Sequence, residues 1–407
     1  MTKKEVPVLL LTGYLGSGKT TLVNHILSNR RGIKFAVIVN DIGEVNIDAS
    51  LIQKGGVVDE KDDSLVALQN GCICCTLKMN LVEQIYDLMR SERFDYIVIE
   101  ASGICEPEPI AQTICSIPQL GEEYRRYGLC RLDSVVTVVD ALRLQDEFGC
   151  GDSLTRSNID EEDIENLIIS QIEFCNMILL NKASEVSPEE RERIKAVIRT
   201  LQPEAEIIEC DYADVDLDLL VNTHRFSYSR VATSAGWIRE IEKSEEEIEE
   251  DNHCHGHHHD HDDDHECDEH CHEHHHHHHH DEGEAEEYGI GTFVYYRRPA
   301  FDIHKFDRFV ALKWHKNVIR TKGILYFSNN RDMSFLFEQA GKQKQLQETG
   351  LWYATASEEE IAEMKEREPA LERDWDPVYG DRMIKLVFIG RNLDREALAR
   401  DLDDCLE

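Results

Sequence analysis

The chain has 407 residues, of which 41% are hydrophobic and 31% are charged, and its formal net charge at pH 7 is −37. This length suffices for two domains with hydrophobic cores, and the acidic balance argues against binding to the phosphate backbone of nucleic acid. No apolar run approaches the roughly 20 residues that a membrane-spanning helix needs, so we expect no membrane partner.

The N-terminal stretch, residues 1–11, carries two lysines and a short apolar run, Val6–Leu11. This run is too short for a signal peptide and leads directly into a glycine-rich loop, so it predicts a buried strand. We therefore expect a cytoplasmic protein. In that compartment the 13 cysteines are expected to be thiols, some of them metal ligands, and not disulfides.

Residues 1–235 alternate between short apolar runs and helical patterns. Strands are predicted at Val6–Leu11, Phe35–Val39, Tyr96–Ile99, Ser134–Val139 and Met177–Leu180. Helical patterns cover Thr20–Asn29 and Met79–Arg90, and Ser187 followed by Pro188 marks a further helix start. This alternation predicts an α/β domain with a mostly parallel sheet covered by helices on both faces.

Residues 236–288 are predicted to be a disordered, acidic, histidine-rich linker. Within them, residues 240–288 hold 21 acidic residues and one lysine, which is more than half of the net charge. Almost no large apolar residue is available there to form a core. Residues 253–280 contain 16 of the 20 histidines, and imidazole suits Zn²⁺, Ni²⁺, Co²⁺ and Cu²⁺. The alternative is a solvated linker whose histidines are incidental.

Residues 289–407 regain globular character and are predicted to form a smaller α+β domain. Its expected strands are Thr292–Tyr296, Gly323–Phe327 and Lys385–Ile389, and its expected helices are Ile303–Leu312 and Arg395–Cys405.

The residues from Gly13 to Thr20, GYLGSGKT, fit the phosphate-loop pattern G-x-x-x-x-G-K-[ST]. Such a loop turns its backbone N–H groups toward phosphates, while Lys19 bridges the β- and γ-phosphates and Thr20 offers its hydroxyl to Mg²⁺. The predicted nucleotide contacts are Gly13, Gly16, Ser17, Gly18, Lys19, Thr20 and Thr21. The alternative is a chance glycine turn, but the strand before the loop and the helix after it favour a P-loop NTPase domain.

Glu100 ends the run YIVIE and is the acidic residue that a nucleotide hydrolase needs after a second strand. It is predicted to hold Mg²⁺ directly or through water, so Lys19, Thr20 and Glu100 form the predicted catalytic set. Gly103 is predicted to bring its N–H near the γ-phosphate. The alternative for Glu100 is a solvated carboxylate at a strand end.

Recognition of the nucleotide base is less clearly marked. A GTPase usually carries N-K-x-D after a later strand, and the chain reads Asn181-Lys182-Ala183-Ser184. Asn181 and Lys182 are predicted to bind nucleotide, but the carboxylate that discriminates guanine is missing at Ser184. Glu185 is the candidate substitute in a shifted loop, and without one the guanine preference would be relaxed.

Three cysteines, Cys72, Cys74 and Cys75, lie within four residues. This spacing lets three thiolates converge on Zn²⁺ or another soft ion while a fourth position stays open, which suits transfer. Glu44, in an acidic loop after the second strand, is the candidate fourth ligand. The alternatives are a redox pair or inert buried thiols for the cysteines, and an ordinary polar loop for Glu44.

Taken together, these segments resemble the CobW family of P-loop metallochaperone GTPases, which are related to the nickel-insertion GTPases of urease and hydrogenase. The matching stretches are LLTGYLGSGKTTL, NDIGEVNID, NGCICC, IVIEASG followed by Pro107, VVTVVDA and LLNK. RTKGILYF and LVFIG resemble the small C-terminal domain of that family. The resemblance covers nearly the whole chain outside the histidine-rich segment, and Ser184 departs from the aspartate that the family more often has.

The resemblance implies that the chain is a GTPase that couples hydrolysis to delivery of a metal, often zinc, to a client metalloprotein. It also implies that Cys72, Cys74 and Cys75 bind that metal. Relatives that serve cobalamin synthesis and nitrile hydratases leave Co²⁺ and Ni²⁺ open, and a homo-oligomer stays open too. Two alternatives remain: a metal-storage or buffering protein gated by nucleotide, and a small-molecule kinase, against which the cysteine cluster argues.

Overall fold

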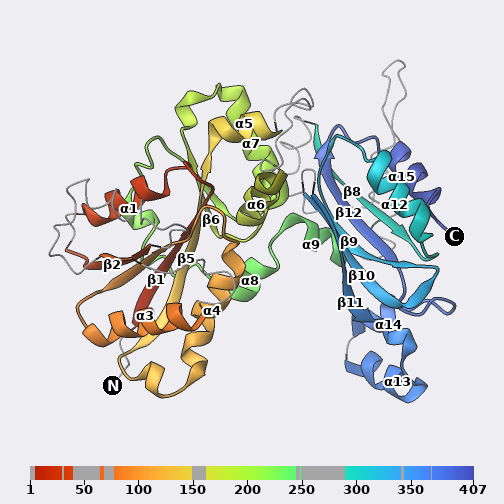
Figure 1. Cartoon of the computed structure of the whole chain (residues 1–407), viewed down its shortest axis with the longest axis horizontal. Helices are drawn as coiled ribbons and strands as arrows, with labels where there is room; N and C mark the ends of the chain where they lie inside the picture. The colour runs from red at the N-terminus through yellow and green to blue at the C-terminus, as the bar shows by residue number, and fades with distance from the viewer. Residues whose placement is uncertain are drawn as a thin grey trace, which may run out of the picture. The chain divides into compact units, whose positions relative to one another are not determined.

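The computed structural model describes residues 5–29, 32–39, 65–67, 78–148, 162–243, 248, 289–340, 343–367 and 369–407. Apart from Gly341–Gln343, the chain divides into a first unit within Met1–Gly236 and a second unit within Trp237–Glu407 (Figure 1). In the described residues each unit has its own β-sheet.

The first unit is built on a parallel sheet. Its described strands are β1 Glu5–Thr12, β2 Phe35–Val39, β3 Leu65–Ala67, β4 Tyr96–Glu100, β5 Leu129–Asp140, β6 Met177–Asn181 and β7 Glu206–Glu209. Their order across the sheet is β3-β2-β4-β1-β5-β6-β7, and every neighbouring pair is parallel. The predicted parallel α/β sheet is confirmed.

Helices cover this sheet. They are α1 Lys19–Leu27, α3 Lys78–Ser91, α4 Pro107–Leu120, α5 Ala141–Phe148, α6 Glu162–Glu173, α7 Pro188–Leu201 and α8 Tyr228–Ala232. All residues of β2, β4 and β6 are buried, so both faces of the sheet are covered. The predicted start of α7 is confirmed, because the Ser187 side chain accepts a hydrogen bond from Glu190 N at 3.2 Å.

The strand register brings the polar residues to one edge of the sheet. Leu11 of β1 pairs with Glu100 of β4, and Thr12 pairs with Thr137 of β5. Asp140, at the end of β5, pairs with Asn181, at the end of β6. Since all these strands are parallel, the loop after β1 and the ends of β4, β5 and β6 meet at the same edge.

The second unit contains a mainly antiparallel sheet. Its strands are β8 Ile290–Arg297, β9 Val318–Phe327, β10 Asn330–Ala340, β11 Gln343–Leu351 and β12 Ile384–Arg391, in the order β11-β10-β9-β12-β8. The pairs β10–β9, β9–β12 and β12–β8 are antiparallel. The helices are α9 Gly236–Glu242, α12 Ile303–Leu312, α13 Glu358–Arg367, α14 Pro369–Arg373 and α15 Arg395–Asp403. The predicted α+β domain is confirmed.

Aromatic side chains fill the core of the second unit, where the ring centroids of Phe301 and Phe306 lie 4.8 Å apart. Asp302 caps α12 by accepting hydrogen bonds from the backbone N–H groups of His304 and Lys305.

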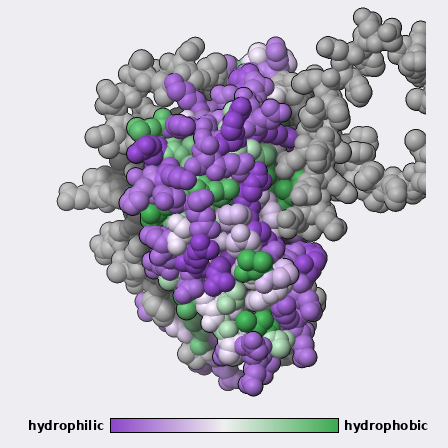
Figure 2. Space-filling view, turned by 90° about the vertical axis from the view of Figure 1, so that its right-hand side faces the viewer, coloured by the Kyte–Doolittle hydropathy of each residue, from purple (hydrophilic) through white to green (hydrophobic). Residues whose placement is uncertain are grey.

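Figure 2 shows one face of the molecule that is largely hydrophilic, with small separate hydrophobic patches. Small separate patches of this kind are ordinary on protein surfaces.

One prediction about this region is wrong in part. Residues 236–242, placed in the disordered linker, form α9. Trp237 and Ile241 pack with Val294 and Val387 of the second sheet, so these apolar side chains have a partner that the sequence pattern did not reveal. The remainder of the predicted linker, including the histidine-rich residues 253–280, lies outside the described residues except for 243 and 248.

Candidate nucleotide-binding site

The glycine-rich loop joins the end of β1 to the start of α1. Gly13 and Gly18 have φ angles of 131° and 114°, which only glycine adopts readily. A Cβ at Gly13 would lie 2.2 Å from the carbonyl oxygen of Val138, and one at Gly18 would lie 2.4 Å from Asn181 Nδ2. Gly16, with φ 78°, has open space around it. The loop therefore needs glycine for close approach at two positions and for backbone conformation at the third.

The ammonium group of Lys19 lies inside the curve of this loop. Its Nζ donates hydrogen bonds to the carbonyl oxygens of Gly13 at 2.8 Å and Tyr14 at 3.1 Å, and the side chain is buried. A buried cation is costly unless charge or strong acceptors surround it. This arrangement therefore holds a positive charge in position for an anion at the loop. Thr21, the last residue of the predicted set, is exposed on α1.

Thr20, in the first turn of α1, meets Glu100, the last residue of β4. Thr20 Oγ1 donates to Glu100 Oε1 at 3.0 Å. The Glu100 side chain is only 1% exposed, so it is no solvated strand-end carboxylate. The pair sets two hard oxygen atoms side by side, which is the donor chemistry that Mg²⁺ takes.

Gly103 lies against the glycine-rich loop. A Cβ on it would come within 2.7 Å of Leu15 N. The carbonyl oxygens of Gly103 and Cys105 both accept hydrogen bonds from Gln171 Nε2, at 3.3 and 3.1 Å. Gln171 is 1% exposed and belongs to α6. It therefore ties the segment after β4 to a helix distant in sequence, a contact that sequence reasoning missed.

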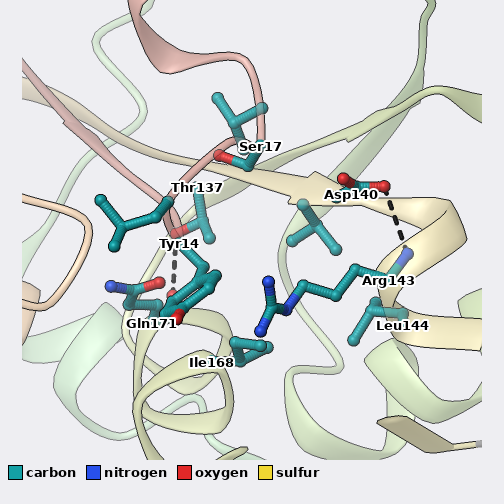
Figure 3. Close-up of a pocket in the computed structure, with 11 residues that line it drawn as sticks. Tyr14, Ser17, Thr137, Asp140, Arg143, Leu144, Ile168 and Gln171 are labelled. Carbon is teal, nitrogen blue, oxygen red and sulfur yellow. Dashed lines mark hydrogen bonds between the residues drawn. The ribbon is translucent and has the colours of Figure 1, made fainter. Parts of the chain in front are cut away.

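A cleft of about 310 Å³, in part open to solvent, lies beside the loop (Figure 3). Its lining includes Tyr14, Ser17, Asp140, Arg143 and Gln171. The Arg143 guanidinium lies 4.1 Å from the centroid of the Tyr14 ring, and Arg143 N donates to Asp140 Oδ1 at 3.2 Å. Ser17 Oγ is buried and meets no hydrogen-bond partner within the described part of the chain. Sequence reasoning did not predict that Tyr14, Asp140 and Arg143 line this cleft.

Asn181 joins the glycine-rich loop to the segment after β7. Its Nδ2 donates to the carbonyl oxygen of Ser17 at 2.8 Å, and its Oδ1 accepts from Ala213 N at 2.9 Å. The neighbouring Lys182 adopts a left-handed conformation, with φ 57°, and its Nζ pairs with Asp140 Oδ2. The sequence motif thus lies at the site, although the hydrogen bonds of the Asn181 side chain are to the protein's own backbone.

Ser184 stands where the motif usually has aspartate. Its backbone N and its Oγ both donate to Asp211 Oδ1, at 3.0 and 2.9 Å. Glu185, the predicted substitute, is exposed, and its backbone N donates to the carbonyl oxygen of Lys182 at 3.0 Å. A carboxylate therefore does lie at this position, but it comes from the segment after β7.

The predicted metal ligands Cys72, Cys74, Cys75 and Glu44 lie outside the described residues. Among the residues that are described, no group of three or more histidine, cysteine or acidic side chains could hold a metal ion. The six described cysteines are free thiols. Burial raises the pKa of Cys130 and Cys175 to about 12, so these two thiols stay protonated at neutral pH.

The described helices include none with the length and apolar character needed to cross a membrane.

Comparisons with known proteins match both units. Residues 7–209 match the nucleotide-binding domain CobW/HypB/UreG, and residues 290–406 match the cobalamin synthesis protein cobW C-terminal domain. The zinc-regulated GTPase metalloprotein activator 1 of Dictyostelium discoideum is 31% identical over 419 residues, covering 99% of this chain and 80% of the relative. The zinc chaperone YjiA of Escherichia coli is 33% identical over 226 residues, 54% of this chain and 62% of the relative. The solved Zn(II)-bound YjiA GTPase aligns over 99% of both chains, with 21% identity and a TM-score of 0.40.

Proposed function

Because the chain belongs to the CobW/HypB/UreG family of P-loop GTPases, we propose that it is a GTP-hydrolysing metallochaperone. It binds zinc at Cys72, Cys74 and Cys75, with Co²⁺ or Ni²⁺ as other cargoes of the same site, and it transfers the metal to a client protein. The observation that carries the nucleotide half of this proposal is the buried Lys19 ammonium inside a glycine loop whose neighbour is the Thr20–Glu100 pair. The metal half is supported by the cysteine spacing and by the names of the relatives.

The residues present fit a nucleotide. The Lys19 ammonium donates to carbonyl oxygens that phosphate oxygens can replace, and the glycines at 13 and 18 keep the loop backbone accessible. They also fit Mg²⁺, which Thr20 Oγ1 and Glu100 would hold. When bound, Mg²⁺ neutralises charge on the transferring phosphate.

Hydrolysis then depends on what the chain's own groups do. Lys19 shifts from the loop carbonyls to the β- and γ-phosphates, and the backbone N–H groups of the loop orient the phosphate chain. Asn181 holds the carbonyl of Ser17 and thereby fixes the loop against the base-binding side.

Coupling to the metal site runs through the segments that touch the loop. Gly103 packs against Leu15. A conformational change of the glycine-rich loop on nucleotide binding would therefore move residues 102–105 and α4, which begins two residues later. The cysteine cluster and the acidic loop with Glu44 lie between β2 and α3 in sequence. Linkage then requires that nucleotide and metal change each other's affinity by the same factor.

A nucleotide-gated storage protein is the second candidate, because 16 histidines cluster in residues 253–280. That segment would bind several ions with moderate affinity and serve as a metal reservoir in either case. Deleting 253–280 should lower zinc stoichiometry and leave GTP turnover largely unchanged. Zinc-dependent turnover favours the chaperone, whereas zinc binding without any effect on turnover favours storage.

The test of the metal site is a zinc titration against a chelating indicator. Cys74→Ser removes one of three thiolates and should weaken the tightest binding phase by roughly 100-fold or more. Cys115→Ser is the matched control, because Cys115 is a free, half-buried thiol on α4. An unchanged tight phase in the Cys74 variant would remove the metal half of the proposal.

A further inference from the structure

The loops that follow β6 and β7 come together at the side of the site where the nucleotide base is expected. Asn181 ends β6 and leads into Lys182–Ser184, and Cys210–Ala213 follows β7. The backbone joins them, because Ala183 N donates to the carbonyl oxygen of Cys210 at 3.2 Å. The first loop carries the asparagine and lysine of N-K-x-D but no acidic residue at the fourth position. The motif itself therefore does not supply the carboxylate that discriminates guanine.

The second loop supplies a carboxylate at that position. Asp211 Oδ1 accepts two hydrogen bonds from Ser184, one from the backbone N at 3.0 Å and one from Oγ at 2.9 Å. Within the described chain no hydrogen bond reaches Asp211 Oδ2. The serine therefore orients the carboxyl group of Asp211 and leaves one of its oxygens available to a ligand.

The backbone of this second loop is held in a conformation that costs energy. Tyr212 and Ala213 have φ angles of 54° and 53°, left-handed values that cost non-glycine residues about 1 kcal/mol or more each. Asn181 Oδ1, which accepts from Ala213 N at 2.9 Å, fixes this conformation. Because Asn181 also holds the phosphate loop, the position of Asp211 is set relative to the phosphates. Tyr212 is 81% exposed on the same loop.

We propose that Asp211 is the residue that recognises guanine. It takes the place of the aspartate that the N-K-x-D motif has where this chain has Ser184. This inference rests on the proposed binding of GTP at Gly13–Thr20. Its carboxylate accepts hydrogen bonds from guanine N1–H and from the 2-amino group, which adenine cannot reproduce. Glu185 is left without this role, because it is exposed and the described residues give its carboxylate no hydrogen bond that would fix it.

The test measures the affinities of GDP, xanthosine diphosphate and ADP for the full chain and for Asp211→Asn. The asparagine amide donates where the carboxylate accepted, so it opposes the 2-amino group of guanine and suits the 2-oxo group of xanthine. GDP affinity should fall by about 10- to 100-fold, and the variant should prefer xanthosine diphosphate. Glu185→Gln is the matched control, and its preference for GDP should stay that of the wild type.

The outcomes separate this inference from the proposed function. If wild type prefers GDP and Asp211→Asn keeps that preference, Asp211 is not the recognition residue, and GTP binding stands. A change of preference from GDP to xanthosine diphosphate in Glu185→Gln would assign guanine recognition to Glu185 and overturn the inference. Equal losses for all three nucleotides in Asp211→Asn would overturn it as well, because they would place Asp211 in folding or phosphate binding. Equal affinity of wild type for GDP and ADP would contradict both proposals.

Discussion

Replacing Gln171 with leucine removes the only side-chain amide donor that the described structure offers to the carbonyls of Gly103 and Cys105. Two buried hydrogen bonds of moderate length are lost, each with a net contribution of about 0.5–1.5 kcal/mol, so the free energy of unfolding should fall by about 1–3 kcal/mol. The segment beside the phosphate loop also loses its anchor. We expect GTP turnover to fall about 10-fold while GDP affinity changes little, since misplaced catalytic groups cost rate more than binding.

The chain offers a matched control in Gln202. It is also fully buried, and its Nε2 donates two hydrogen bonds, to the carbonyl oxygen of Glu173 at 2.6 Å and to Ser234 Oγ at 2.8 Å. Gln202→Leu should lose similar stability in urea unfolding and keep wild-type turnover. If both variants lose stability and turnover alike, or if Gln171→Leu turns over GTP normally, the positioning role of Gln171 is refuted.

Two further predictions concern the loop and the frame of the sheet. Gly18→Ala should abolish measurable GDP binding, because the new Cβ meets Asn181 Nδ2 at 2.4 Å, whereas Gly16→Ala should weaken binding only modestly; calorimetry showing equal losses would contradict this. Asp133 is buried, and burial would raise its pKa, but hydrogen bonds from His224 N, Arg131, Tyr96 and Thr223 N hold the pKa below the usual value. Its stabilisation is therefore present above pH of about 4 and is lost as pH falls through the folded-state pKa. Asp133→Asn should lower the free energy of unfolding by about 3–5 kcal/mol at pH 7 and reduce its dependence on pH in the acid range. An unchanged dependence on pH in that range would contradict this prediction.

The strands of the first sheet were predictable because they are continuous apolar runs buried on both faces, as in Phe35–Val39. β11, Gln343–Leu351, was missed because most of its side chains are polar and exposed, and its pairing rests on backbone hydrogen bonds that leave no periodic pattern. β10 was missed for a related reason, since its first half is polar and exposed.

The residues of the candidate site fall into the same two groups: those marked by a local sequence pattern and those whose contacts depend on the fold. That Lys19, Thr20 and Asn181 lie at the candidate site was predictable, because each belongs to a local motif whose spacing reflects the geometry of one loop. Gln171 lies 68 residues from Gly103, and Asp211 lies 27 residues from Ser184, so their contacts follow from the fold and not from spacing. The only sequence signal for Asp211 was the missing acid at Ser184, and that signal pointed first to the adjacent Glu185.

In the proposed mechanism, nucleotide controls the affinity of the chain for its metal. The direct test is the zinc dissociation constant of the tightest phase, measured on full-length protein with GDP and with a non-hydrolysable GTP analogue. We expect values that differ by about 5-fold or more, with zinc shifting the nucleotide affinities by the same factor. Equal zinc affinities in the two nucleotide states would contradict it.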